Sequence, residues 1–189
     1  MPERLLWFCC ALLWLSAAVG CSQKSSELSP EDQEEMEAVE TISVSSTAFQ
    51  EGERIPDTYT CSGENSSPAL SWSGVPGQTT SLALIMDDPD APSGTFVHWV
   101  LFNLEPSLTE LPQGIQTQAG SGISGTNGAR KLGYTGPCPP PGKPHRYFFK
   151  LYALDTQLDL SEGATKAEVE QAMQGHILAQ GQLMGTFSR

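Results

Sequence analysis

Basic residues are scarce in this sequence. The 189 residues hold 10 Lys and Arg against 22 Asp and Glu, a net charge of −12. A polyanion would be repelled by such a chain, which argues against nucleic acid as a partner. Residues 22–40 alone carry seven acids and one lysine, about half of this net charge. The rest of the chain has the composition of an ordinary soluble domain.

Several signatures of catalysis are also missing. The sequence has no HExxH or CxxC spacing for a metal and no GxSxG turn for a nucleophilic serine. These absences predict a protein that is not an enzyme and needs no cofactor or metal. A hydrolase that uses aspartate and histidine side chains stays open as an alternative.

Short strands dominate the predicted secondary structure. The chain is long enough for one domain, and its 18 glycines and 14 prolines favour many turns. Runs of apolar or β-branched residues bounded by Gly, Pro, Asn and Ser predict strands. These runs lie at residues 42–49, 69–75, 81–87, 95–104 and 145–155.

One helix is predicted near the end of the chain. Thr165 and Glu168 form a capping box at its start, and Gly181 is expected to end it. Its apolar face would contain Val169, Ala172, Met173, His176 and Ile177. His176 is therefore expected to be structural. The strands and this helix together predict a mainly β fold: an antiparallel β-sandwich with one C-terminal helix.

The first residues have the pattern of an export signal. A positive start, an apolar stretch from Leu5 to Leu15 and small residues up to Gly20 predict a signal peptide over 1–20. "AVGC", ending at Cys21, resembles a bacterial lipobox, which implies lipidation of Cys21. Cleavage nearby, giving a soluble exported protein, stays open. Residues 21–40 would be an acidic tether, and 41–189 the folded domain.

Polar residues that could bind a ligand lie at the ends of three predicted strands. Asp87 and Asp88 end a buried run, and two prolines stiffen the turn that follows. Period two then places Phe96, His98, Val100 and Phe102 on one face. His145, Tyr147, Phe149 and Leu151 share a face in the same way. Each strand thus begins with a polar group on a face that turns apolar, as the mouth and wall of a small pocket would.

Two cysteines remain in the domain. Cys61 and Cys138 would lie in an oxidising compartment after export, where a pair can form a disulfide. Sequence supplies no geometry, so two packed thiols without a bridge stay open as the alternative.

The motifs "DDPDAPSGTFVHW" (87–99) and "YTGPCPPPGKPHRYFFKLYALD" (134–155) resemble the phosphatidylethanolamine-binding protein family, and most closely its bacterial Raf kinase inhibitor-like branch. The resemblance covers roughly residues 42–189. It implies a Greek-key β-sandwich with a small anion-binding pocket. The positions that match the family's ligand-binding motifs are Asp88, Asp90, Pro92, His98, Cys138, Pro139, His145 and Tyr147.

The resemblance implies binding of phosphate or a phospho-headgroup. Five of the eight basic residues in 41–189 fall between Arg130 and Lys150, as an anion site would need. We therefore expect an exported lipoprotein, anchored in the bacterial envelope at the outer membrane or periplasm, that binds such anions. It could modulate an envelope partner, and an inhibitor of an envelope protease or kinase is the alternative. A homodimer is plausible from bacterial relatives, and no protein target is indicated.

Overall fold

A computed structural model describes residues 39–115 and 122–189. The predicted signal peptide, Cys21 and almost all of the acidic tether lie outside the described residues. Within them, no helix is long and apolar enough to cross a membrane.

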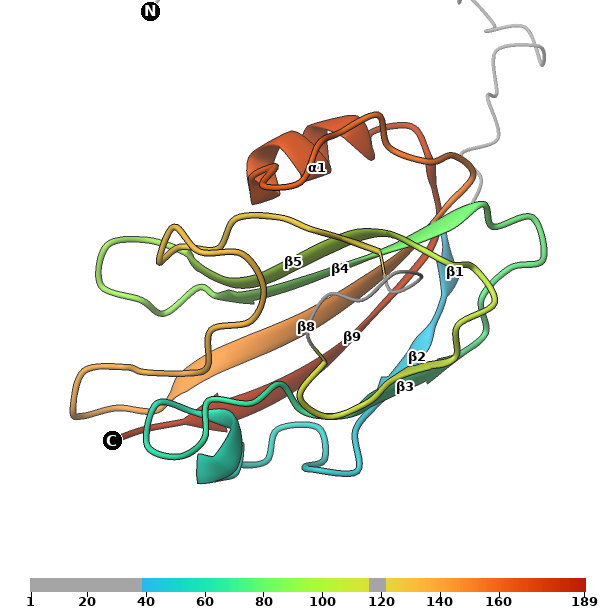
Figure 1. The fold of residues 1–189 in the computed structure, drawn as a ribbon. Helices are drawn as coiled ribbons and strands as arrows, with labels where there is room; N and C mark the ends of the chain where they lie inside the picture. The colour runs from blue at the N-terminus through green and yellow to red at the C-terminus, as the bar shows by residue number, and fades with distance from the viewer. Residues whose placement is uncertain (1–38, 116–121) are drawn as a thin grey trace, which may run out of the picture. The chain divides into compact units, whose positions relative to one another are not determined.

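The described residues of the domain form two β-sheets and one α-helix (Figure 1). The six-stranded sheet has the order β1-β9-β8-β4-β5-β7, and the three-stranded sheet has the order β2-β3-β6. The strands of the larger sheet are β1 (Glu40–Thr41), β9 (Ile177–Phe187), β8 (His145–Leu154), β4 (Ser81–Asp88), β5 (Phe96–Leu104) and β7 (Ile123–Ser124). Those of the smaller sheet are β2 (Ser43–Ser45), β3 (Leu70–Ser73) and β6 (Glu110–Leu111). The other elements are a short 3-10 helix, η2 (Asp57–Tyr59), and the helix α1 (Lys166–Ala172).

The prediction of a mainly β fold with one helix is confirmed, and each of the five predicted strands corresponds to a strand of the structure. Pairing is antiparallel throughout the described sheets except between β1 and β9, which run parallel. The prediction of a wholly antiparallel arrangement is therefore wrong at this pair. A two-residue strand has no periodicity of its own, so its partner and direction depend on tertiary contacts.

The end of the chain differs most from the prediction. The capping box between Thr165 and Glu168 is present, but α1 ends at Ala172 and β9 begins at Ile177. Gly181 therefore lies within β9. A Cβ atom there would collide with the carbonyl of Ile42. Pairing with the whole length of β8 overrides the helical periodicity of these residues, because tertiary context outweighs intrinsic propensity.

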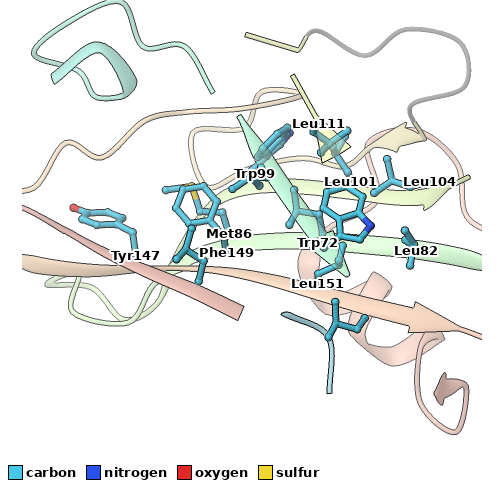
Figure 2. Close-up of a cluster of buried hydrophobic side chains, with 14 of the residues drawn as sticks. Trp72, Leu82, Met86, Trp99, Leu101, Leu104, Leu111, Tyr147, Phe149 and Leu151 are labelled. Atoms are coloured by element: carbon cyan, nitrogen blue, oxygen red, sulfur yellow. The ribbon is translucent and has the colours of Figure 1, made fainter. Parts of the chain in front are cut away.

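Two apolar clusters cover the two faces of the larger sheet. The main cluster lies between the sheets, where Trp72 of β3 packs among side chains of β4, β5 and β8 (Figure 2). The second lies under α1, where Val169 and Met173 contact residues such as Ile85 and Val100. All of β4 is buried because both of its faces are covered. Two acids, Asp87 and Asp88, end this buried strand, and the second of them lines the candidate site.

Candidate functional site

A cavity of about 330 Å³ opens where β4 ends and where β5 and β8 begin. Its lining comes from the end of β4 and the turn after it, the start of β5, the first residue of β8, and the loop before β8. The lining residues are Asp88, Ala91, Pro92, Phe96, His98, Ala129, Thr135, Gly136, Cys138, Pro139, Pro140 and His145. Of the eight predicted ligand-binding positions, the structure brings six to this cavity. Asp90 and Tyr147 do not line it.

Asp88 and His145 form a closely bonded pair in the cavity wall. Asp88 Oδ2 lies 2.8 Å from His145 Nδ1, and the Asp88 side chain is only 4% exposed. The other carboxylate oxygen accepts a hydrogen bond from the Asp90 backbone N–H at 2.8 Å. Because an ionised carboxylate only accepts, the proton of this pair resides on His145 Nδ1. The Nε2 atom of His145 is the ring nitrogen that Asp88 leaves available.

Asp90 forms an ion pair with Arg146. Its two carboxylate oxygens accept from Arg146 Nε at 2.8 Å and from a terminal guanidinium nitrogen at 2.7 Å. These hydrogen bonds lower the pKa of Asp90 from 3.8 to about 2. The contact explains why Asp90 stays outside the cavity. It also neutralises one of the bases that the sequence offered for an anion.

A β-bulge directs His98 toward the cavity. Met86 pairs with Trp99, but the next residue, Asp87, pairs with Val97, so His98 is the extra residue between them. The predicted shared face of Phe96, His98, Val100 and Phe102 is therefore wrong: Val100 and Phe102 pack under α1. His98 instead packs against Tyr147, with ring centroids 5.2 Å apart. A bulge turns the side chains beyond it to the other face, which period-two counting cannot anticipate.

The backbone of Thr135 fixes the His98 ring. His98 Nδ1 lies 2.6 Å from the Thr135 carbonyl oxygen, and the Thr135 N–H donates to the His98 carbonyl at 2.9 Å. His98 is only 3% exposed. Burial lowers the pKa of His98 from its ordinary value of 6.5, outweighing the hydrogen bond to Thr135 and the nearby acids. His98 is therefore held as a neutral, oriented ring.

Tyr147 lies beneath the site rather than in its lining. The residue is fully buried, and its hydroxyl has no hydrogen-bond partner among the described residues. Figure 2 shows this hydroxyl pointing away from the other labelled core side chains. Burial, and then the charge of Asp88, raise the pKa of Tyr147 well above 10. The phenol is therefore a protonated donor at neutral pH.

The cavity wall between Tyr134 and Cys138 is fastened to the segment around η2. Cys61 and Cys138 form a disulfide, which answers the question that the sequence left open. Beside it, Gly136 N–H donates to Asn65 Oδ1 at 2.7 Å, and Tyr134 Oη donates to the Tyr59 carbonyl at 2.6 Å.

Gly136 also shows why this wall is rich in glycine. A Cβ atom at this position would lie 2.5 Å from the Tyr59 carbonyl oxygen and 2.9 Å from Thr60 Cα. Sequence reasoning missed Thr135, Gly136 and Phe96 as lining residues. The signal that could have found the first two is their place in the glycine-rich loop just before Cys138.

Metal ligands do not gather in the described ranges, where no three His, Cys, Asp or Glu side chains are arranged to hold an ion. The cavity instead combines apolar surface from Phe96 and the prolines with a small polar set of Asp88, His98 and His145. A ligand pocket of this kind uses apolar contact for affinity and a few polar groups for orientation.

Comparison with known proteins identifies the family of the chain. The family model described as phosphatidylethanolamine-binding protein matches residues 45–188. The chain belongs to this family. A UPF0098 protein of Methanothermobacter thermautotrophicus is 54% identical over 146 residues, covering 75% of this chain and 95% of its own. A UPF0098 protein of Chlamydia muridarum is 44% identical, covering 78% and 99%.

Solved structures of family members share the fold. A phosphatidylethanolamine-binding protein homologue from Chlamydia trachomatis superposes with a TM-score of 0.74 at 42% identity, covering 79% of this chain and 98% of its own. YbcL of E. coli, described as a member of the mammalian family, gives 0.73 at 31% identity, covering 78% and 98%. These bacterial and archaeal relatives agree with the predicted bacterial branch.

Proposed function

We propose that this chain binds phosphate-like anions, including phospho-headgroups, in the cavity between Asp88, His98 and His145. The observation that carries the proposal is the bonded Asp88–His145 pair in the wall of a 330 Å³ cavity otherwise rich in apolar surface. An oxyanion enclosed there would exchange water for fixed, oriented partners. Hydrogen bonds with one charged partner contribute about 1.5–3 kcal/mol each before desolvation is counted.

The role of Asp88 follows from its bonds. It fixes the tautomer of His145 so that an anion would meet Nε2. If this nitrogen also takes a proton, the imidazolium would lie between Asp88 and the ligand and balance the two negative charges. The same carboxylate lines the cavity and could accept the ammonium group of an ethanolamine ester. The name of the family supports such a headgroup as one ligand.

Binding without catalysis is the function that we favour. Cys138, the sulfur-bearing residue of the lining, is held in a disulfide and carries no thiolate. A hydrolase in which Asp88 and His145 activate a water directly stays open as the alternative. No particular contact favours a protease or kinase inhibitor. The Greek-key connectivity and the homodimer remain expectations from the family resemblance.

A lipid anchor at Cys21 is a separate proposal. It depends on the sequence "AVGC" and the acidic residues after it. The bridge between Cys61 and Cys138, both exposed, supports an oxidising compartment. Cys21→Ser should move the protein from membrane to soluble fractions. Unchanged, detergent-dependent fractionation of that variant would contradict the anchor.

An NMR titration tests the binding proposal. Phosphoethanolamine should shift the imidazole resonances of His98 and His145 and leave those of His176 unchanged, because His176 lies outside the cavity lining. Choline chloride, which lacks the phosphate, serves as the control. Shifts of equal size for all three histidines, or none at all, would contradict the proposal.

A further inference from the structure

We infer that His98 acts as a hydrogen-bond acceptor in the cavity, so that the site selects oxyanions that still carry a proton. Such ligands are hydrogen phosphate and the monoanion of a phosphate monoester, as opposed to sulfate and its esters. The inference rests on the proposed function and specifies its ligand more narrowly.

The first step is the position of the proton on His98. The Thr135 carbonyl oxygen can only accept, so the ring nitrogen 2.6 Å away, Nδ1, must donate. The backbone N–H of Thr135 also donates to the His98 carbonyl, which holds the two residues in register. The tautomer is thus set by a backbone contact at the rear of the ring.

The second step is the charge of the ring. His98 is packed between Phe96 and Tyr147, with ring centroids 4.8 Å and 5.2 Å away. The charged or titratable groups near it are Asp87 and Asp88 on β4 and His145 and Tyr147 on β8. The acids raise the pKa of His98, but burial lowers it by more, so the neutral ring prevails.

The third step is what the neutral ring offers a ligand. Once Nδ1 carries the proton, Nε2 of the neutral ring bears a lone pair and can only accept a hydrogen bond. His98 lines the cavity together with Asp88, whose carboxylate is also an acceptor. Two acceptors disfavour a ligand whose oxygens are all unprotonated. A P–OH group supplies the missing donor, and a methyl sulfate ion has none.

Methyl phosphate and methyl sulfate form a matched pair of probes. Below about pH 6 methyl phosphate is largely a monoanion with one P–OH, since phosphate monoesters lose their second proton near there. Methyl sulfate has the same charge and a similar shape without the proton. Calorimetry at about pH 5.5 should show methyl phosphate binding at least about tenfold more tightly, because an unmatched buried acceptor is costly.

Raising the pH to about 7.5 removes the proton from methyl phosphate. Its affinity should then fall by at least about tenfold more than that of methyl sulfate, whose pH dependence reports only the protein's own titration. The variant His98→Gln, whose amide can donate as well as accept, should bring the two affinities close together. Nitrogen NMR of His98 in the free wild type should show the proton on Nδ1.

The outcomes are distinct. Equal affinities for the two esters in the wild type, or a proton on Nε2 of free His98, would overturn the selectivity and leave the proposed function standing. If neither ester binds at either pH, the proposed function falls and the selectivity falls with it. Should His98→Gln not fold, the wild-type comparison of the two esters still decides.

Discussion

Asp87 and Asp88 are adjacent at the end of β4, yet they serve the two faces of the sheet differently. On the helix side, Asp87 Oδ2 accepts from Lys150 Nζ at 3.0 Å and also from Lys166 of α1. On the pocket side, Asp88 accepts from His145. Both side chains are almost fully buried, at 2% and 4% exposed. Strand alternation alone sends them to opposite faces.

The difference lies in the partners. Lysine keeps its charge through the neutral range, so Asp87 forms a permanent tie between β8, β4 and α1. The Asp88 pair instead leaves His145 Nε2 available in the cavity wall, where a ligand can contact it. On the helix side, α1 packs over an apolar cluster. On the pocket side, the loop that contains Cys138 is held by the disulfide to Cys61. A structural ion pair and the pair of the proposed binding site are thus formed by adjacent residues of the sequence.

The largest expected effect concerns the disulfide of the pocket side. Replacing Cys61 and Cys138 together by serine should lower the free energy of unfolding by about 2–4 kcal/mol, because the bridge closes a loop of 77 residues in the unfolded chain. Urea unfolding measures it. Hydrogen exchange should quicken at Thr135 and Gly136 and stay unchanged at Val169 under α1. Equal exchange in both regions would contradict a wall held by this bond, and a thiol reductant should not affect the double variant.

Next comes the helix side. Asp87→Ala should cost about 2–3 kcal/mol, below the usual range for a broken buried pair because both lysines are partly exposed. Anion affinity should stay within about twofold of wild type, a change of about 0.4 kcal/mol or less in binding free energy. Thermal unfolding and calorimetry measure the two quantities. If Asp87→Ala keeps full stability, or if it loses anion binding, the assignment of a structural role to Asp87 and a binding role to Asp88 is wrong.

Asp88→Asn should show the opposite balance. The amide keeps the volume but cannot hold His145 as a charged acceptor would, so stability should drop by only about 1–2 kcal/mol. Affinity for phosphoethanolamine should weaken about tenfold, equivalent to 1.4 kcal/mol. The measurement is calorimetry beside Asp87→Ala. Affinity equal to that of wild type would show that Asp88 has no role in binding.

A smaller, pH-dependent effect on the free energy of unfolding is expected from Asp90, the third acid of the turn. The pKa of Asp90 in the folded state is about 2, below its ordinary value of 3.8. Between about pH 2 and pH 4, the folded state therefore binds fewer protons than the unfolded chain. Its contribution to stability is therefore present above about pH 4 and is lost as the pH falls toward 2. Arg146→Gln should flatten this part of the stability profile. An unchanged slope would mean that the Asp90–Arg146 contact is not maintained in solution.

The smallest effect is expected at His176. Its side chain is 45% exposed and bonds Asp155 at 2.8 Å, so the prediction of a buried helical histidine is wrong. His176→Gln should change the free energy of unfolding by less than about 0.5 kcal/mol, as at other exposed sites. Thermal unfolding at neutral pH checks it. A drop of several degrees would restore a structural role.

Much of the framework could be predicted because it depends on local pattern. The apolar runs of β4 and β8 are long and bounded by turn residues, and their alternation places Tyr147, Phe149 and Leu151 in the core. One site motif directly follows β4, and the other leads directly into β8. Short strands such as β6 and β7, of two residues each, carry no such pattern and depend on their neighbours.

The parts that sequence could not provide are matters of register and pairing. One extra residue between β4 and β5 decides which face His98 occupies, and no residue type announces it. Residues 177–187 suit either a helix or a strand locally, and the free edge of β8 decides. Arg146 looked like a cation for the ligand, but it is taken by Asp90. Each case turns on a contact between segments far apart in the chain.

The central claim is that His145, held by Asp88, binds the anion. Isothermal titration calorimetry with phosphoethanolamine and inorganic phosphate on wild type, His145→Ala and the matched histidine variant His176→Gln tests it most directly. The account predicts binding by wild type and His176→Gln alike, and more than about tenfold weaker binding by His145→Ala, which should also unfold at a lower temperature because Asp88 loses its partner. Equal affinities in all three proteins would contradict it.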